Sequence, residues 1–232
     1  MANIILEDIK SQIKNGNSIT RLILINVAVF LIISIFRIFD ALGILSSFFF
    51  FLVDNISYHI SIKGFIYKPW TIITYMFTHI ELFHILWNMI TLYWFGQILA
   101  SYTSEKKIVP LYLMGGISGA LFTTLLFILV PAFHHFIDSP MIGASAGATA
   151  IIIASATLVP NVKLNLMLIG PVKLIYLALF VVFVDVLNVA SHNDIGGRLS
   201  HLGGALMGYL FIVQYKKGND LVACSLTEFE KL

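Results

Sequence analysis

Six long apolar stretches constrain this chain more than any other feature of its sequence. A helix needs about 20 predominantly apolar residues, within a range of about 17 to 25, to cross the hydrocarbon core of a bilayer. The stretches of that kind run approximately over 20–36, 80–100, 108–131, 142–159, 171–190 and 199–215. Of the 232 residues, 59% are hydrophobic and only 11% are charged, whereas about a quarter are charged in a soluble domain. We therefore predict an all-α, polytopic membrane bundle of six transmembrane helices.

The six stretches form one predicted membrane domain, which covers 20–217, and the rest of the chain flanks it. Residues 1–19 lack the apolar core of a signal peptide and carry isoleucines at roughly helical spacing. They form either a short amphipathic helix on the membrane surface or a tail without structure. The apolar patch 44–53 is too short to cross the membrane and lies inside the long outer connection 37–69, so we expect it to be interfacial or re-entrant. Residues 218–232 form a C-terminal tail.

Basic residues indicate how the bundle is oriented in the membrane. With six spans both termini lie on one side, and cytoplasmic connections carry the excess of lysine and arginine. Ten of these residues fall in the terminal segments and in the connections after the second and fourth stretches, and four fall on the other side. We therefore expect cytoplasmic termini, and spans two, four and six then begin near the outer face. A compact core of this kind suits a bacterial inner (plasma) membrane, where we expect the protein.

Several partners and cofactors are not expected. The net charge is only +2 and the basic residues are scattered, which argues against nucleic acid as a partner. The single cysteine, Cys224, cannot form an intrachain disulfide. We predict no cofactor and no metal. His79, His84, His134 and His135 could gather on the outer side, but they lack the HExxH spacing of a zinc protease.

Polar residues near the beginnings of three spans form the candidate functional site, because polar groups within a membrane are costly and mark function by default. They are His79, His84 and Asn88 at the second span, Ser145 with Gly143 and Gly147 at the fourth, and His201 with Gly204 and Gly208 at the sixth. His84 and Asn88 are four residues apart, which places them on one helical face.

Each of these residues also has a structural explanation when it is taken alone. A serine in a membrane helix often bonds to its own backbone, and small residues four apart usually mark close helix packing. A lone histidine could line a pore, bind a metal or bond to another helix. Together, however, the topology places the Ser145 hydroxyl, the His201 imidazole and the His84–Asn88 pair at one depth on three helices. That combination favours a catalytic site.

The chemistry gives each group a task. Neutral His201 is a suitable base for the Ser145 hydroxyl, which is a weak nucleophile until its proton is taken. The Asn88 amide, a ring N–H of His84 and the backbone N–H of Ser145 are donors that could stabilise an oxyanion. Flanking glycines allow the helices to approach until the serine and the histidine could touch.

Support for His201 by a third residue is open at this point. No carboxylate is obviously placed to orient the ring, so we expect a Ser-His dyad. Asp185 and Asn188, near the outer end of the fifth span, are the alternative supporting residues.

These residues resemble the rhomboid family of intramembrane serine proteases, from the segment PWTIITYMFTH at 69–79 through the sixth span. The resemblance implies a six-span core and a hydrolase mechanism. It assigns the nucleophile to Ser145 in a GxS motif that begins at Gly143, the base to His201 followed by Gly204 and Gly208, oxyanion donors to His84 and Asn88, and a supporting role to His79.

The match to the family pattern departs at several positions. Ala146 follows the serine where the family often has glycine, and the glycine is displaced to Gly147. Thr149 stands one turn beyond the serine, where relatives often carry a large side chain. Arg37 and Trp70 do not form the family's Trp-Arg pair. The string GASAG also fits the GxSxG pattern of soluble hydrolases, but that motif requires a preceding strand, and the sequence predicts none.

The predicted function is that of an intramembrane serine endopeptidase that hydrolyses peptide bonds in or near transmembrane segments of other membrane proteins. The resemblance implies that its partners are such substrates, which enter from the lipid bilayer and partly unwind. Unwinding is needed because a helix keeps its carbonyls in internal hydrogen bonds. The aromatic fifth span and the connection 191–200 are candidates for the gate. A catalytically silent rhomboid-like protein that binds or escorts membrane proteins is the main alternative, and a transporter or channel with a histidine relay is another. The oligomeric state is not indicated.

Overall fold

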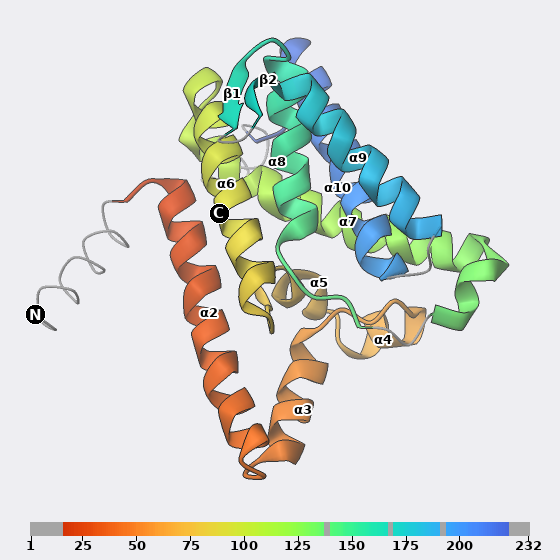
Figure 1. Ribbon diagram of the computed structural model, residues 1–232. Coiled ribbons are helices and arrows are strands. Elements are labelled where there is room, and N and C mark those ends of the chain that lie inside the picture. Colours follow the sequence, from red (N-terminus) through yellow and green to blue (C-terminus); the bar gives the residue numbers. More distant parts are fainter. Residues whose placement is uncertain (1–15, 137–139, 167–168, 191–193, 223–232) are drawn as a thin grey trace, which may run out of the picture.

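The protein is a bundle of helices, described by a computed structural model for residues 16–136, 140–166, 169–190 and 194–222 (Figure 1). Its long helices are α2 Ser18–Ala41, α3 Ser46–Ile56, α6 Leu82–Tyr102, α7 Ile108–Leu129, α8 Ser145–Leu158, α9 Leu174–Ala190 and α10 Ile195–Lys216. The short ones are α4 Ile62–Tyr67, α5 Thr71–Thr74 and the 3-10 helices η1 Tyr75–Phe77, η2 Glu105–Lys107 and η3 Pro131–Phe136. The predicted helical fold is confirmed.

Each of the six apolar stretches corresponds to one helix, and the largest differences in their bounds are at two ends. α2 continues to Ala41, five residues past the predicted end. α10 begins at Ile195, four residues before the predicted start, because Asp194 caps it by accepting a hydrogen bond from the Gly197 N–H. Position 201 is therefore well inside its helix rather than at its first turn. Residues 1–15, where the surface helix was expected, lie outside the described residues.

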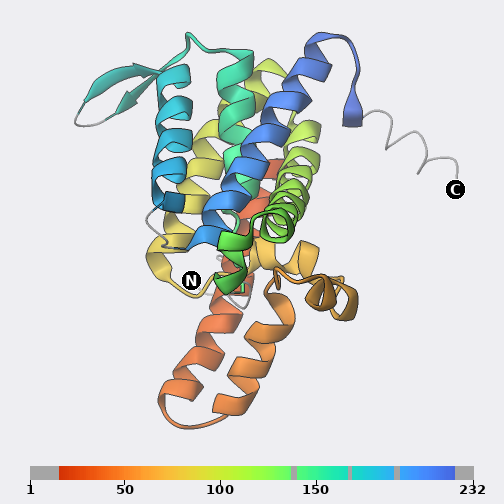
Figure 2. The same cartoon turned by 90° about the vertical axis from the view of Figure 1, so that its right-hand side faces the viewer.

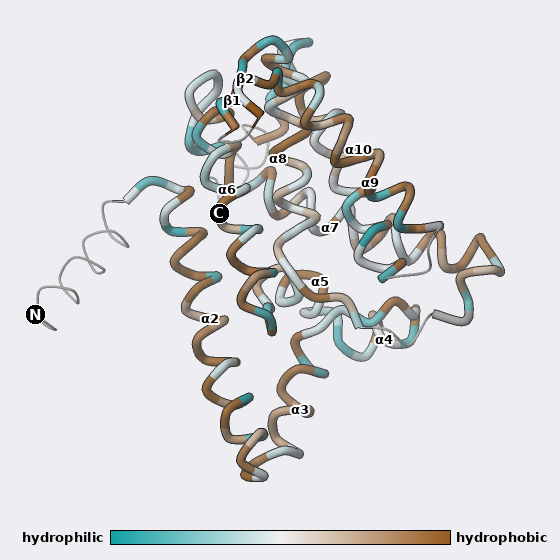
Figure 3. The backbone as a smooth tube through the Cα atoms, in the orientation of Figure 1, coloured by the Kyte–Doolittle hydropathy of each residue, from teal (hydrophilic) through white to brown (hydrophobic). Residues whose placement is uncertain are grey.

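Length and hydropathy support some of the spans more strongly than others. Within the described residues, three segments are long and apolar enough to cross a membrane alone: Ser18–Ala41, Leu82–Tyr102 and Glu105–Leu129. The apolar helices α8 and α9 have only 14 and 17 residues. Apolar residues predominate along α2, and hydrophilic ones gather in the connections at the bundle's ends (Figure 3). The count of six spans remains a prediction.

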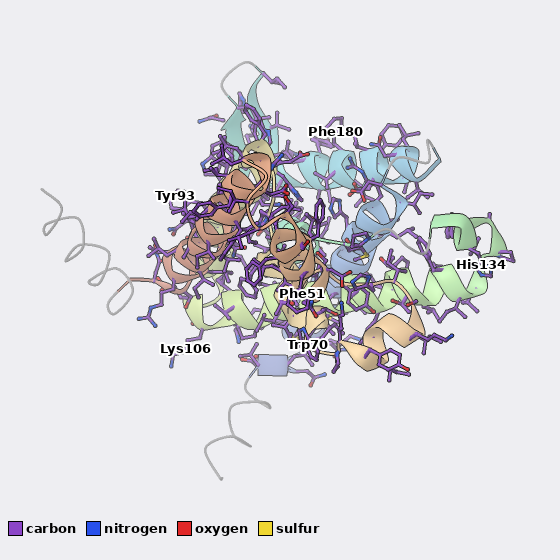
Figure 4. The ribbon with its side chains drawn as sticks, turned by 90° about the horizontal axis from the view of Figure 1, so that it is seen from below. Phe51, Trp70, Tyr93, Lys106, His134 and Phe180 are labelled. Carbon is purple, nitrogen blue, oxygen red and sulfur yellow. The ribbon has the colours of Figure 1, made fainter. Side chains whose placement is uncertain are left out.

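The long connection after α2 contains helices. The apolar patch 44–53 lies mostly in α3, which packs antiparallel to the end of α2 in a hairpin that extends past the other helices (Figures 1 and 2). Lys68 forms an ion pair with Asp54 of α3 and, through that hydrogen bond, holds the pKa of the carboxyl below its usual value. The Trp70 indole donates to the Asn55 carbonyl (2.8 Å). Figure 4 views the molecule from this end, with Phe51 and Trp70 labelled.

Glycines bring α10 into direct contact with α8. A Cβ atom at Gly204 would lie 2.1 Å from the Ala146 carbonyl oxygen, and one at Gly208 would lie 2.2 Å from that of Ala150. Both distances are far below van der Waals contact, so these positions accept no side chain without movement of a helix. Since Ala146 follows Ser145, this contact fixes α10 beside the start of α8.

A small β-hairpin was not predicted. Strands β1 Lys163–Leu166 and β2 Gly170–Lys173 pair antiparallel and project sideways from the bundle (Figure 2). The fifth apolar stretch was expected from residue 171, but α9 begins at Leu174. The glycine and proline at the start of β2 disfavour a helix there.

Candidate active site

Ser145 is the first residue of α8, and the segment before it is held by hydrogen bonds that its backbone N–H groups donate. The Gly143 N–H donates to the Tyr75 carbonyl (2.8 Å), and the Ala144 N–H donates to Nε2 of His79 (3.2 Å). Ser145 is half-buried. The first N–H groups of a helix have no acceptor within that helix. The start of α8 therefore presents a hydroxyl and backbone donors at one point.

A carboxylate orients His201, which corrects the expectation of an unsupported dyad. Nδ1 of His201 lies 3.0 Å from Oδ1 of Asp185 on α9, and the Asp185 side chain is only 3% exposed. A carboxylate oxygen accepts, so Nδ1 carries the proton and Nε2 is left as a base. The Asn188 amide donates instead to the Val184 carbonyl of its own helix (2.8 Å).

The same carboxylate oxygen also binds Arg198. A guanidinium nitrogen of Arg198 lies 3.1 Å from Oδ1 of Asp185. Oδ2 of Asp185 and Nε of Arg198 are buried with no hydrogen-bond partner among the described residues. The arginine neutralises a carboxylate that would otherwise be costly to bury. Sequence reasoning did not assign Arg198 a role, although its spacing of three residues from His201 places both on one helical face.

One cavity of about 260 Å³ collects the polar side chains of four helices. Its polar lining includes Asn88 of α6, Ser145 and Thr149 of α8, Asp185 of α9, and Arg198 and His201 of α10. Within the described residues no hydrogen bond joins Ser145 to His201. Catalytic hydrogen bonds are often long in a free enzyme and shorten when substrate binds.

His79 joins the cavity wall to the start of α8. Nε2 of its fully buried ring accepts from the Ala144 N–H and lies 3.2 Å from the Asn88 amide nitrogen. Because a backbone N–H can only donate, Nε2 carries a lone pair and the ring proton lies on Nδ1. His79 thus fixes the Asn88 amide relative to Ser145.

His84 lies beside the cavity rather than in its lining. Its ring stacks edge-on against His79, with centroids 5.1 Å apart, and contacts Gly143. A Cβ at Gly143 would lie 2.7 Å from two ring atoms of His84, and the φ angle of this glycine is +115°. His84 and Asn88 are four residues apart in α6 and share one face, as predicted. The His84 ring packs against the loop before α8, whereas the Asn88 amide lines the cavity.

The remaining predicted residues pack around the site. A Cβ at Gly147 would lie 2.6 Å from the Tyr112 ring of α7, so this glycine seats α8 on α7. Arg37 donates to the Ile80 carbonyl (2.6 Å) and does not meet Trp70. Among the described residues no group of three or more His, Cys, Asp or Glu could hold a metal. The side chain of His135 lies outside those residues.

Comparison with known proteins finds relatives that carry mitochondrial names. RHOMBOID-like protein 12, mitochondrial, of Arabidopsis thaliana is 31% identical over 157 residues, which cover 64% of this chain and 47% of the relative. Rhomboid protein 1, mitochondrial, of Saccharomyces cerevisiae is 28% identical over 158 residues, covering 64% and 42%. Presenilin-associated rhomboid-like protein A, mitochondrial, of Danio rerio is 25% identical over 138 residues, covering 59% and 35%. These names do not support the expected bacterial type, and they contradict the expected bacterial plasma membrane.

The region shared with each of these three proteins spans less than half of that protein's length. Residues 67–217, more than half of the chain, match the Rhomboid domain, and every cavity residue named above falls within that range. The chain therefore belongs to the rhomboid family.

Proposed function

We propose that the chain is an intramembrane serine endopeptidase with Ser145 as nucleophile and His201 as base. The observation that carries this proposal is the shared cavity, in which Ser145 meets a histidine whose Nδ1 is held by a buried carboxylate. A serine, a neutral imidazole and an orienting acid are the parts that nucleophilic acyl transfer requires.

The first step would transfer the Ser145 proton to Nε2 of His201 as Oγ attacks the peptide carbonyl. The imidazolium that forms is stabilised by Asp185, which already accepts from Nδ1. When the tetrahedral intermediate collapses, the C–N bond breaks and His201 gives its proton to the leaving amine. Water, deprotonated by His201, then attacks the acyl ester and releases Ser145.

The oxyanion would be met by donors from two helices. The Ser145 backbone N–H lies at the start of α8, and the Asn88 amide lines the same cavity. One amide hydrogen of Asn88 can point to His79, which leaves the other for substrate. Each such donor typically contributes about 10² to 10³ in rate. His84, against Gly143, would act by packing this loop rather than by lining the cavity.

The substrate would be a transmembrane segment of another protein. The cavity lies between α6 and α9, and Phe180 of α9 lines it while being 65% exposed on the outer surface of the helix (Figure 4). A segment that approaches from the lipid must open its helical hydrogen bonds before its carbonyls reach Ser145. Glycine and proline near the cut bond would make that opening less costly.

A second candidate is a silent binding or escort protein, which the missing Ser145–His201 hydrogen bond favours.

The test uses purified full chain in detergent and in liposomes with a transmembrane reporter. Wild type should cut the reporter and label with a fluorophosphonate, Ser145→Ala should do neither, and His201→Ala should lose cleavage. Ser101→Ala, which removes an exposed hydroxyl bonded only within α6, is the matched control. Cleavage by Ser145→Ala would refute the mechanism, and a wild type that neither cuts nor labels across several reporters would favour the escort function.

A further inference from the structure

An apolar groove lies next to the catalytic cavity, farther along the same helices. It has a volume of about 470 Å³ and is formed by α8, α9 and α10. The cavity contacts Val181, Val184 and Asp185 of α9, whereas the groove contacts Ile175, Ala178 and Val182. Along α8 the groove runs from Ile153 to Pro160, a rise of roughly 10 Å. It therefore occupies the end of the bundle opposite Ser145.

Two lysines of the β-hairpin are close in sequence to residues that line one end of this groove. Lys163 and Lys173 are directly opposite each other in the ladder. Because the Leu174 N–H donates to the Val162 carbonyl (2.9 Å), the neighbouring 163–173 pair is of the non-hydrogen-bonded type, in which side chains lie closest and on one face. Lys163 follows the groove residue Pro160 by three positions, and Lys173 precedes Ile175 by two.

A third lysine lies at the same end. Nζ of Lys216 donates to the carbonyl of Thr157, a residue of the groove wall (2.7 Å). Nearby acidic residues do not balance these charges: of the described ones in the connections at this end, Asp220 is paired with Lys107, and Glu105 lies beside Lys106 in η2. Among the described residues neither hairpin lysine has an ion-pair partner.

Like charges directly opposite in a hairpin destabilise it, unless an anion lies between them. In a membrane protein an apolar groove is filled by lipid chains, and juxtamembrane lysines attract anionic headgroups. We propose that this groove binds one anionic phospholipid, with an acyl chain along α8 and α9 and the headgroup phosphate at Lys163 and Lys173. The lipid would lie against the helix that also walls the catalytic cavity. This proposal does not depend on whether the chain cuts peptides.

The test measures phospholipid retained by the purified full chain, using native mass spectrometry and titration in mixed micelles. Phosphatidylglycerol should bind once per chain and more tightly than phosphatidylcholine with the same acyl chains. Lys163→Gln/Lys173→Gln should weaken phosphatidylglycerol about 25-fold, at about fivefold for each lysine. Lys63→Gln/Lys106→Gln removes the same net charge from two exposed sites away from the groove and should change affinity less than about twofold.

A second variant separates the contribution of the lipid's acyl chain from that of its headgroup. Val182→Trp fills the groove without changing any charge, and it should weaken phosphatidylglycerol while leaving the melting temperature close to that of wild type. Inorganic phosphate should not displace the lipid. Equal binding of phosphatidylcholine, full binding by Val182→Trp, or displacement by phosphate alone would overturn the proposal. A dimer of the chain that Val182→Trp dissolves would show instead that a second copy fills the groove.

Discussion

One oxygen atom of Asp185 accepts from two donors on the neighbouring helix. His201 and Arg198 both bond to Oδ1, at 3.0 and 3.1 Å. The arginine supplies the charge that allows a carboxylate to remain inside the bundle, and the carboxylate in turn fixes the histidine tautomer. Removing Asp185 alone therefore has two effects, a lost orientation of His201 and an unpaired Arg198, and these can be separated.

Replacing Asp185 by asparagine should lower kcat about 10²- to 10⁴-fold with little change in KM, because the imidazole loses its preferred tautomer and the imidazolium loses its counter-charge. Asp185→Asn/Arg198→Gln also removes the unpaired cation, so its melting temperature should recover toward that of wild type. Its kcat should stay low. Recovery of kcat in the double variant would mean that Asp185 only neutralises Arg198 and does not position His201.

Gly143 is expected to tolerate no side chain for two reasons. Alanine there would adopt a φ of +115° and would meet the His84 ring at 2.7 Å. Gly170→Ala is the matched control, since Gly170 has a φ of +85° and open space around it. The control should lose about 1 to 2 kcal/mol of stability from strain alone, and Gly143→Ala should lose more, together with fluorophosphonate labelling of Ser145. Equal thermal unfolding of the two variants would contradict a role for the His84 contact.

At the scale of elements, packing between α8 and α10 sets the distance between the serine and the histidine. The two close contacts are one turn apart, at Gly204 against Ala146 and at Gly208 against Ala150. Only the first adjoins Ser145. The two glycines are therefore similar in their sterics but differ in their distance from the site.

Gly204→Ala and Gly208→Ala should each cost about 1 to 3 kcal/mol of stability, because each forces α10 away from α8. Activity per folded molecule should fall further in Gly204→Ala, since the displacement there separates His201 from Ser145. Thermal unfolding and single-turnover cleavage on the same samples measure both quantities. An equal loss of activity in the two variants would show that the effect is global rather than local to the site.

The elements differ in how far sequence could predict them. Apolar length predicted six helices, because a long run without charges has few other structures open to it. α9 has so few polar residues that its sequence does not indicate which face is turned to the other helices. The contact of Asp185 with His201 therefore could not be derived. The one signal for it was a lone carboxylate in an apolar helix, which marks a functional residue by default. The β-hairpin was missed because β1 lies in the connection after the fourth stretch and β2 overlaps the predicted start of the fifth, and each strand has only four residues.

At the scale of the whole molecule, the two ends of the bundle differ in chemistry. The cavity lined by Ser145 and His201 lies at the start of α8, and the basic hairpin follows the end of α8. Beyond the cavity end, the α2–α3 hairpin extends past the other helices (Figure 1). How this body lies in the membrane depends on whether the short helices α8 and α9 cross it together with α10.

Labelling of cysteines from one side of sealed vesicles decides this point. Cys224, the only cysteine, reports the side on which the chain continues after α10. In a Cys224→Ser background, Lys14→Cys reports the segment before α2, Lys106→Cys the connection after α6, and Lys63→Cys the connection after α2. A membrane-impermeant maleimide reveals which of these positions share a side.

With six spans, positions 14, 106 and 224 should label from one side and position 63 from the other. Two crossings separate position 14 from position 106, and four crossings separate position 106 from position 224. If only α2, α6 and α7 cross, the single change is that position 224 moves to the side of position 63. The pair 14 and 224 therefore distinguishes an even from an odd number of spans. An odd number would contradict the six-span bundle on which the lateral route to Ser145 proposed here depends.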